Sequence, residues 1–221
     1  MTNVTGGQTV RNPWPMIGGC ASSTCREGED FIRPIYGKES DVIVLTKPLG
    51  TQLAVNMFEW MRTAAKYNRV KDVITVDEIV AAYKMAMTSM SYLNLDAARL
   101  MWKHHAHGCT DVTGFGMLGH SNNLAQEQEE AVDLVIDTLP IIRGMIKVEK
   151  HLNNNWNLFK GRSAETSGGL MIMMTPEDAA QYIKDYKEVS GHDAWIVGKV
   201  VKGSRQGRVV ENPTLIEVEA W

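Results

Sequence analysis

Short runs of apolar residues, each bounded by glycine, proline or polar residues, predict several β-strands along the chain. The clearest run is residues 41–46, where β-branched residues dominate and Pro48 follows. Similar runs predict strands over residues 16–25, 132–136, 169–174, 195–201 and 215–218. Residues 203–207 begin and end with glycine, which predicts a hairpin-like turn between Val200-Val201 and Val209-Val210.

Other segments repeat their apolar residues with helical spacing. Residues 51–67 have such an apolar face, and residues 75–78 have the pattern of a capping box that opens a helix running to Met90. Thr175 and Pro176 are typical of the cap and the first residue of a helix. The same pattern predicts helices over residues 96–102 and 114–128, and a helix that Pro140 opens and that continues to Val148.

Strands and helices alternate along the chain without a strict βαβ rhythm. This order predicts an α+β fold, with a mixed β-sheet and helices packed on one face. Residues 26–40 are polar and rich in turn residues, which indicates a linker. We therefore divide the chain into residues 1–28, the last piece of one domain, and residues 29–221, a complete α+β domain.

The composition is typical of a globular protein, with 44% hydrophobic and 22% charged residues among 221. The net charge of −3 and the lack of a dense Lys/Arg cluster argue against nucleic acid as a partner. No stretch reaches the ~20 apolar residues that span a bilayer, and no signal peptide is visible, so we expect a cytoplasmic protein without a membrane partner. Cys20, Cys25 and Cys109 are expected to be reduced thiols, because no second pair completes a zinc site.

The segment from Thr110 to His120 has residues suited to a metal-bound phosphate. Asp111 ends an apolar run, where its carboxylate can ligate a hard cation such as Mg²⁺. Thr113 and Gly114 follow, and glycines let backbone N–H groups approach phosphate oxygens at the start of a helix. A strand, a glycine turn and a helix without any ligand would give the same pattern.

Three histidines, His104, His105 and His107, raise the alternative of a transition-metal site. Two of them would share one face of a strand or of a helix. No cysteine or carboxylate spacing nearby completes a set of ligands, so we favour a structural role. Cys109 lies close to Asp111 in the sequence, but we favour a small core residue there.

Two more glycine turns accompany the Asp111 segment. Residues 4–14 contain Gly6-Gly7-Gln8-Thr9, and Glu165-Thr166-Ser167-Gly168-Gly169 leads into the apolar residues 170–174. Together with residues 45–52 and 194–198, and in this order, these motifs resemble the selenophosphate synthetases (selenide, water dikinases) of the aminoimidazole ribonucleotide synthetase superfamily. The resemblance covers nearly the whole chain.

The resemblance implies the C-terminal α+β domain of that fold, preceded in residues 1–28 by a remnant of the N-terminal ATP-binding domain. It implies that the whole enzyme converts ATP, selenide and water into selenophosphate, AMP and phosphate for selenocysteine biosynthesis. Asp111 would be one of the aspartates that hold Mg²⁺, with Thr113 and Gly114 beside it. The residues that would contact ATP are Gly6, Gly7, Gln8 and Thr9.

In that family a catalytic cysteine or selenocysteine, a lysine and two further metal-binding aspartates precede the segment matched by residues 5–9. No such residues precede it here, so we expect a truncated chain that is inactive alone. The full-length enzyme is expected to be a homodimer, and this chain a monomer or a weaker dimer. Two alternatives stay open: another ATP-using member of the superfamily, such as a purine-biosynthesis enzyme or a thiamine-phosphate kinase, and a nucleotide-binding or regulatory paralogue without catalysis.

Overall fold

The computed structural model describes residues 13, 18–20, 22–26 and 30–221. The chain divides into two units, residues 1–31 and residues 32–221, and the fold described below is that of the second unit. Residues 16, 17 and 21 of the strand expected over residues 16–25 lie outside the described part, and the described residues there form no strand. Assigning residues 1–28 to an N-terminal domain stays a prediction.

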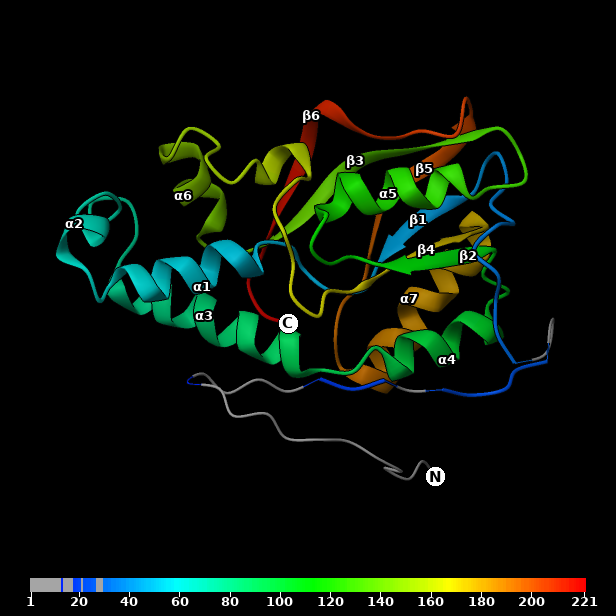
Figure 1. Ribbon diagram of the computed structural model, residues 1–221, viewed down its shortest axis with the longest axis horizontal. Coiled ribbons are helices and arrows are strands. Elements are labelled where there is room, and N and C mark those ends of the chain that lie inside the picture. The colour runs from blue at the N-terminus through cyan, green and yellow to red at the C-terminus, as the bar shows by residue number, and fades with distance from the viewer. Residues whose placement is uncertain (1–12, 14–17, 21, 27–29) are drawn as a thin grey trace. The chain divides into compact units, whose positions relative to one another are not determined.

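A six-stranded mixed β-sheet forms the centre of this unit (Figure 1). Its strands lie in the order β2-β4-β1-β5-β3-β6, and neighbours are antiparallel except β3 and β6. The prediction of a mixed sheet is therefore confirmed. The strand bounds are β1 (Val42–Leu45), β2 (Gly108–Asp111), β3 (Val132–Ile142), β4 (Leu170–Met174), β5 (Trp195–Lys202) and β6 (Gly207–Val218).

Helices occupy most of the remaining chain between these strands. The segment expected to be one helix over residues 51–67 is two helices, separated by a turn at residues 61–63. A short 3₁₀-helix spans Leu158–Lys160. The helix bounds are α1 (Thr51–Trp60), α2 (Ala64–Tyr67), α3 (Val76–Ser91), α4 (Leu95–Lys103), α5 (Gly116–Gln126), α6 (Met145–His151) and α7 (Pro176–Ser190).

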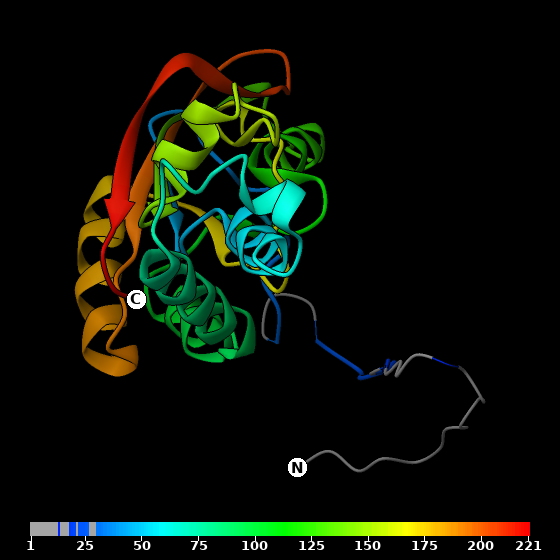
Figure 2. The same ribbon diagram turned by 90° about the vertical axis from the view of Figure 1, so that its left-hand side faces the viewer.

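The helices cover both faces of the sheet, whereas the sequence prediction placed them on one. Helices α1, α3, α5 and α6 share a core with Met171 and Met173 of β4, and α4 and α7 share a second core with Ile172 and Met174. In Figure 2, α7 (orange) lies on the opposite side of the sheet from α1 and α5. The reason is the composition of β4, whose five residues are all apolar and buried, so that each face needs a covering layer.

Pro140 does not open a helix, as the sequence predicted, but lies inside β3. The strand continues to Ile142 because its second half pairs with β6, and α6 begins only after Gly144, which has φ 81°. Proline is tolerated at this point because the pairing between β3 and β5 stops at Ile136 and Gly198, before Pro140. The carbonyl of Pro140 accepts a hydrogen bond from the backbone N of Leu49 (2.8 Å).

The predicted hairpin at residues 203–207 is also wrong. β5 and β6 are not neighbours, because β3 lies between them and β6 runs parallel to β3. The connection passes over the start of β3, where Asp133 Oδ1 accepts hydrogen bonds from the backbone N of Ser204 (2.7 Å) and Gln206 (3.0 Å). A buried carboxylate, which a local turn pattern does not reveal, therefore organises the crossing.

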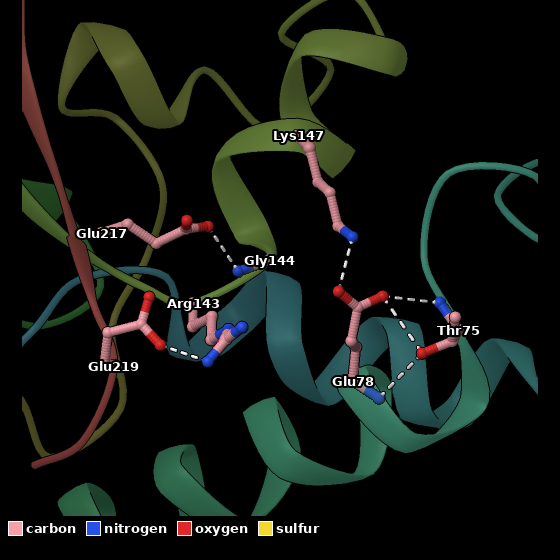
Figure 3. A network of polar contacts seen from close by, with 7 residues as sticks. All are labelled: Thr75, Glu78, Arg143, Gly144, Lys147, Glu217 and Glu219. Atoms are coloured by element: carbon pink, nitrogen blue, oxygen red, sulfur yellow. Dashed lines mark hydrogen bonds and ion pairs between the residues drawn. The ribbon is translucent and has the colours of Figure 1, made fainter.

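The capping box predicted at residues 75–78 is confirmed (Figure 3). The Thr75 hydroxyl accepts from the backbone N of Glu78 (3.2 Å), and the Glu78 carboxylate accepts from the backbone N of Thr75 (2.9 Å). Lys147 of α6 donates to the same carboxylate (2.7 Å), which ties α6 to the start of α3. The predicted cap of α7 is confirmed as well, with Thr175 as N-cap and Pro176 as its first residue.

Candidate functional site

Three loops meet at one end of β1, β2 and β4, and they carry the motifs singled out in the sequence. They are residues 46–51 after β1, residues 111–115 after β2, and residues 165–169 before β4. The backbone N of Val112 donates to the carbonyl of Gly169 (2.9 Å), which joins the last two loops directly. The fold therefore assembles segments that are at least fifty residues apart in the sequence.

Asp111 is the last residue of β2, an outer strand of the sheet, and it is exposed. Its backbone is paired with Leu170 of β4, so the strand fixes where its carboxylate leaves the sheet. Among the described residues, no group of three His, Cys, Asp or Glu side chains could hold a metal ion by itself. A lone exposed carboxylate fits Mg²⁺, which is commonly held by one or two carboxylates plus phosphate oxygens and water.

Gly114 and the start of α5 form the wall next to Asp111. No atom lies within 4 Å of the position that a Cβ on Gly114 would occupy, so its backbone faces open space. Gly116, with φ 68°, is instead in close contact with the neighbouring chain, because a Cβ there would lie 2.6 Å from the carbonyl oxygen of Gly161. One side of the turn is thus packed, and the other faces open space.

The ring of His120 contacts this turn at Thr113 and Phe115. Its Nε2 lies 3.1 Å from the Thr113 hydroxyl and accepts a hydrogen bond from the backbone N of Phe115 (3.4 Å). Burial lowers the pKa of His120, while the negative charge of Asp111 acts in the opposite direction. A neutral ring with Nε2 as acceptor agrees with the lowered pKa and with the hydrogen bond from the backbone N of Phe115.

Two buried ionisable side chains, Lys47 and Glu165, hold the loops together, and neither was assigned a role from the sequence. Lys47 is 1% exposed, and burial lowers its pKa to about 8. Glu165 is 4% exposed, and burial raises its pKa to about 7. The only sequence signal for them was a charged residue within a glycine- or proline-containing motif beside an apolar run.

The three histidines near β2 do not converge on one point. The described residues hold no metal cluster there, because each ring faces a different carboxylate. The structural role that we favoured for them stays a prediction. The pairs are His104 with Asp185 (3.0 Å), His105 with Asp178 (3.7 Å) and His107 with Asp41 (2.7 Å).

The remaining candidates are the cysteines and the N-terminal glycine turn. Cys109 is partly buried in β2, and burial raises its pKa to about 11, as expected for a packed rather than a reactive thiol. Cys20 and Cys25 are exposed and free. Gly6, Gly7, Gln8 and Thr9 lie outside the described residues, so their role as ATP contacts stays a prediction.

Comparison with known proteins places this architecture in a family. The model of the AIR synthase related protein family, C-terminal domain, matches residues 38–211, and the chain belongs to this family. The chain is 45% identical to a selenide, water dikinase of Dictyostelium discoideum, over 99% of this chain and 62% of that protein. It is 50% identical to selenide, water dikinase 2 of Homo sapiens, over 98% of this chain and 49% of that protein. The resemblance seen in the motifs is confirmed, and the chain spans about half to three-fifths of these relatives.

Solved structures share the same fold at low sequence identity. Thiamine monophosphate kinase from Aquifex aeolicus superposes with a TM-score of 0.56 at 15% identity, covering 86% of this chain and 56% of that chain. The hydrogenase maturation protein HypE from E. coli gives a TM-score of 0.58 at 14% identity, covering 82% of this chain and 49% of that chain. These likenesses confirm the α+β fold. In the described part of the chain, no helix is long and apolar enough to cross a membrane.

Proposed function

We propose that this chain is the part of a selenide, water dikinase that presents Asp111 and the glycine turn after it to magnesium-bound ATP. The observation that carries the proposal is 45–50% identity to selenide, water dikinases from three organisms over 98–99% of the chain. The whole protein would convert ATP, selenide and water into selenophosphate, AMP and phosphate. ATP as the substrate is further supported by HypE, a relative in fold, which has been solved in complex with ATP.

In this proposal the described residues supply position and charge rather than covalent chemistry. Asp111 would ligate Mg²⁺, which neutralises phosphate charge when it is bound. Gly114 would let the backbone approach phosphate oxygens, and Thr113 with His120 would hold the turn in place. The predicted nucleotide contacts in residues 6–9 belong to the same proposal.

The relatives are longer than the region that this chain matches. We infer that the catalytic cysteine or selenocysteine, its lysine and the partner aspartates lie in the part of the relatives that this chain does not match. This chain alone would then form no selenophosphate. We further infer a homodimer for the whole protein and a cytoplasmic location, which the three free cysteines support.

Phosphorus NMR with Mg²⁺, ATP and selenide tests the proposal. The samples are this chain alone, this chain fused to the unmatched portion of a 50% identical relative, and that relative as a positive control. We expect selenophosphate and AMP only from the fusion and the relative, and their loss when Asp111→Asn is introduced into the fusion. Selenophosphate from this chain alone would contradict the inferred division of labour. ATP binding without turnover in the fusion would favour the non-catalytic paralogue.

A further inference from the structure

Glu165 lies where the three site loops meet, and its carboxylate has unusual partners. Oε1 accepts a hydrogen bond from the backbone N of Gly50 (2.7 Å). Oε2 accepts from the backbone N of Thr51 (2.9 Å) and from the Thr51 hydroxyl. These are the partners that the described residues supply, and none of them is a cation. A buried carboxylate is therefore held by neutral donors at the start of α1.

The beginning of α1 explains part of this arrangement. The first N–H groups of a helix lack acceptors within the helix, and Gly50, with φ 101°, offers no side chain to cap them. Glu165 supplies the acceptors from 115 residues away in the sequence. Its negative charge also suits the positive end of the helix dipole. The carboxylate thus acts as a remote N-terminal cap.

The backbone of Glu165 has a second role that capping does not require. Its N–H donates to the carbonyl of Thr113 (3.0 Å), and the same carbonyl accepts from the backbone N of Gly116 (3.0 Å) at the start of α5. At the other end of this turn, Val112 donates to Gly169 (2.9 Å). The loop that follows Asp111 is therefore bonded at both ends to the segment that contains Glu165.

That segment has little freedom to shift without moving the loop. A Cβ on Gly168 would lie 1.9 Å from the carbonyl oxygen of Val112, so the two backbones are in direct contact. Ser167 has φ 49°, and its carbonyl accepts a hydrogen bond from Lys47 Nζ (2.8 Å). A displacement of Glu165 is therefore passed on to the loop beside Asp111 rather than absorbed.

We propose that Glu165 is a positioning residue that sets where Asp111 and Gly114 meet the ligand. It does so by anchoring α1 through its carboxylate and Thr113 through its backbone. The identity of the ligand, magnesium-bound ATP, rests on the proposed function, whereas the anchoring rests on the contacts above. This gives a physical role to the Glu165-Thr166-Ser167-Gly168-Gly169 motif.

Amide hydrogen exchange measured by NMR on the 221-residue chain without nucleotide tests the anchoring. In Glu165→Gln, one carboxylate oxygen becomes a donor that faces the donors of α1. We expect exchange to become about tenfold faster or more at Gly50 and Thr51, and also at Val112 and Gly116. Faster exchange confined to Gly50 and Thr51 would show a simple helix cap and would overturn the proposal.

Glu149→Gln is the matched control, since Glu149 is also fully buried and its carboxylate accepts from the backbone N of Trp156 (3.0 Å) and Leu158 (3.1 Å). Both amides donate to Oε1, and Oε2 has no hydrogen-bond partner among the described residues, so glutamine can keep the oxygen acceptor while it removes the buried charge. Glu149→Gln should therefore leave exchange at Val112 and Gly116 unchanged. If Glu165→Gln does not fold, Thr51→Val takes its place, because it removes the contact of the hydroxyl to Glu165, together with the hydrogen bond that the hydroxyl accepts from the backbone N of Thr166 (3.3 Å), and leaves the carboxylate itself intact. Unchanged exchange at Val112 and Gly116 in Thr51→Val would then count against the proposal.

Binding of Mg²⁺ and ATP, followed by calorimetry on the same variants, is the functional measurement. We expect Glu165→Gln to weaken binding about tenfold while Glu149→Gln leaves it unchanged. If the unmodified chain binds no nucleotide, the proposed function is in doubt while the exchange result still decides the anchoring. If exchange at Val112 and Gly116 changes but nucleotide affinity does not, Glu165 anchors the loop without positioning the ligand, and the proposal is overturned.

Discussion

Lys47→Met is the substitution whose effect the structure lets us work out most fully. Lys47 is 1% exposed, and its Nζ donates to the carbonyls of Ser89 (2.9 Å), Tyr92 (2.7 Å) and Ser167 (2.8 Å). Methionine has nearly the same length and fills the same space, but it has no donor and no charge. The variant therefore separates the effect of the ammonium group from that of packing.

Two opposing terms set the magnitude. Burial lowers the pKa of Lys47 from 10.5 to about 8, which corresponds to about 3 kcal/mol of desolvation that methionine does not incur. The three carbonyls, however, lose their donor, and each buried group left unpaired costs about 1–3 kcal/mol. The balance is a destabilisation of roughly 3 kcal/mol, or a fall in Tm of about 6–12 °C for a domain of this size.

The pH dependence provides a second, independent signature of the same group. The folded-state pKa of Lys47 lies below the unfolded-state value of 10.5, so the unfolded chain binds more protons between about pH 8 and 10.5. The contribution of this group to the free energy of unfolding therefore rises with pH across that range, by about 1 kcal/mol between pH 7 and pH 9. Lys47→Met lacks this rise. The difference in free energy of unfolding between the native chain and the variant should therefore grow by the same amount.

Urea unfolding followed by circular dichroism at pH 7, 8 and 9 measures both effects. Lys66→Met, at an exposed position in α2, makes the same chemical change without burial and should stay within about 0.5 kcal/mol of the native chain at each pH. A Lys47→Met variant that is as stable as the native chain would refute the role of the three carbonyl contacts. A difference in free energy of unfolding that does not change with pH would refute the conclusion that Lys47 is a buried ammonium group with a lowered pKa.

Three further predictions follow from single contacts. Thr75→Ala removes the hydroxyl that accepts from the backbone N of Glu78 and should destabilise the chain by about 1 kcal/mol in thermal unfolding, whereas Thr75→Ser should be nearly neutral. Gly168→Ala places a Cβ 1.9 Å from the carbonyl oxygen of Val112 and should cost about 3 kcal/mol or prevent folding, as measured by urea unfolding. Asp111→Asn should leave the Tm unchanged within a few degrees but weaken Mg²⁺-dependent ATP binding about tenfold by calorimetry, and equal affinity would argue against a metal ligand at this position.

Local patterns in the sequence predicted the elements whose structure depends on neighbouring residues. The strand at residues 41–46, the capping box at Thr75 and the cap at Thr175 are all present, because each is decided within a few residues. Pro140 was assigned wrongly because its conformation depends on pairing with β6, more than seventy residues later. The turn at residues 203–207 was misread for the same reason, since β3 separates the two strands that it connects.

The candidate site shows the same division between local and distant information. The sequence indicated the Asp111 turn and the segments around Lys47 and Glu165, and the fold brings them together. It did not reveal what Lys47 and Glu165 do, because their partners lie 42 to 120 residues away. Only the three-dimensional arrangement shows that their charges are buried and directed at backbone groups.

The positions of these two charges follow from the way the loops meet. The loops approach each other backbone to backbone, as the contacts of Gly168 and Gly169 show, and Thr51 at the start of α1 and Ser89 near the end of α3 are buried. Buried backbone groups must still be paired, and apolar side chains cannot pair them. Lys47 supplies donors to the carbonyls at the C-terminal end of α3, and Glu165 supplies acceptors at the N-terminal end of α1.

Each charge also has the sign that the adjacent helix end favours, a cation at the C-terminus of α3 and an anion at the N-terminus of α1. The start of α5, the third helix end at this junction, is paired by backbone carbonyls instead, because Gly116 donates to Thr113 (3.0 Å) and Leu118 donates to Gly161 (2.8 Å). Gly114, just before this helix, faces open space. The open space at Gly114 and the exposed carboxylate of Asp111 are where the proposed magnesium-bound phosphate would lie. The two buried charges thus hold in place the loops around this proposed position.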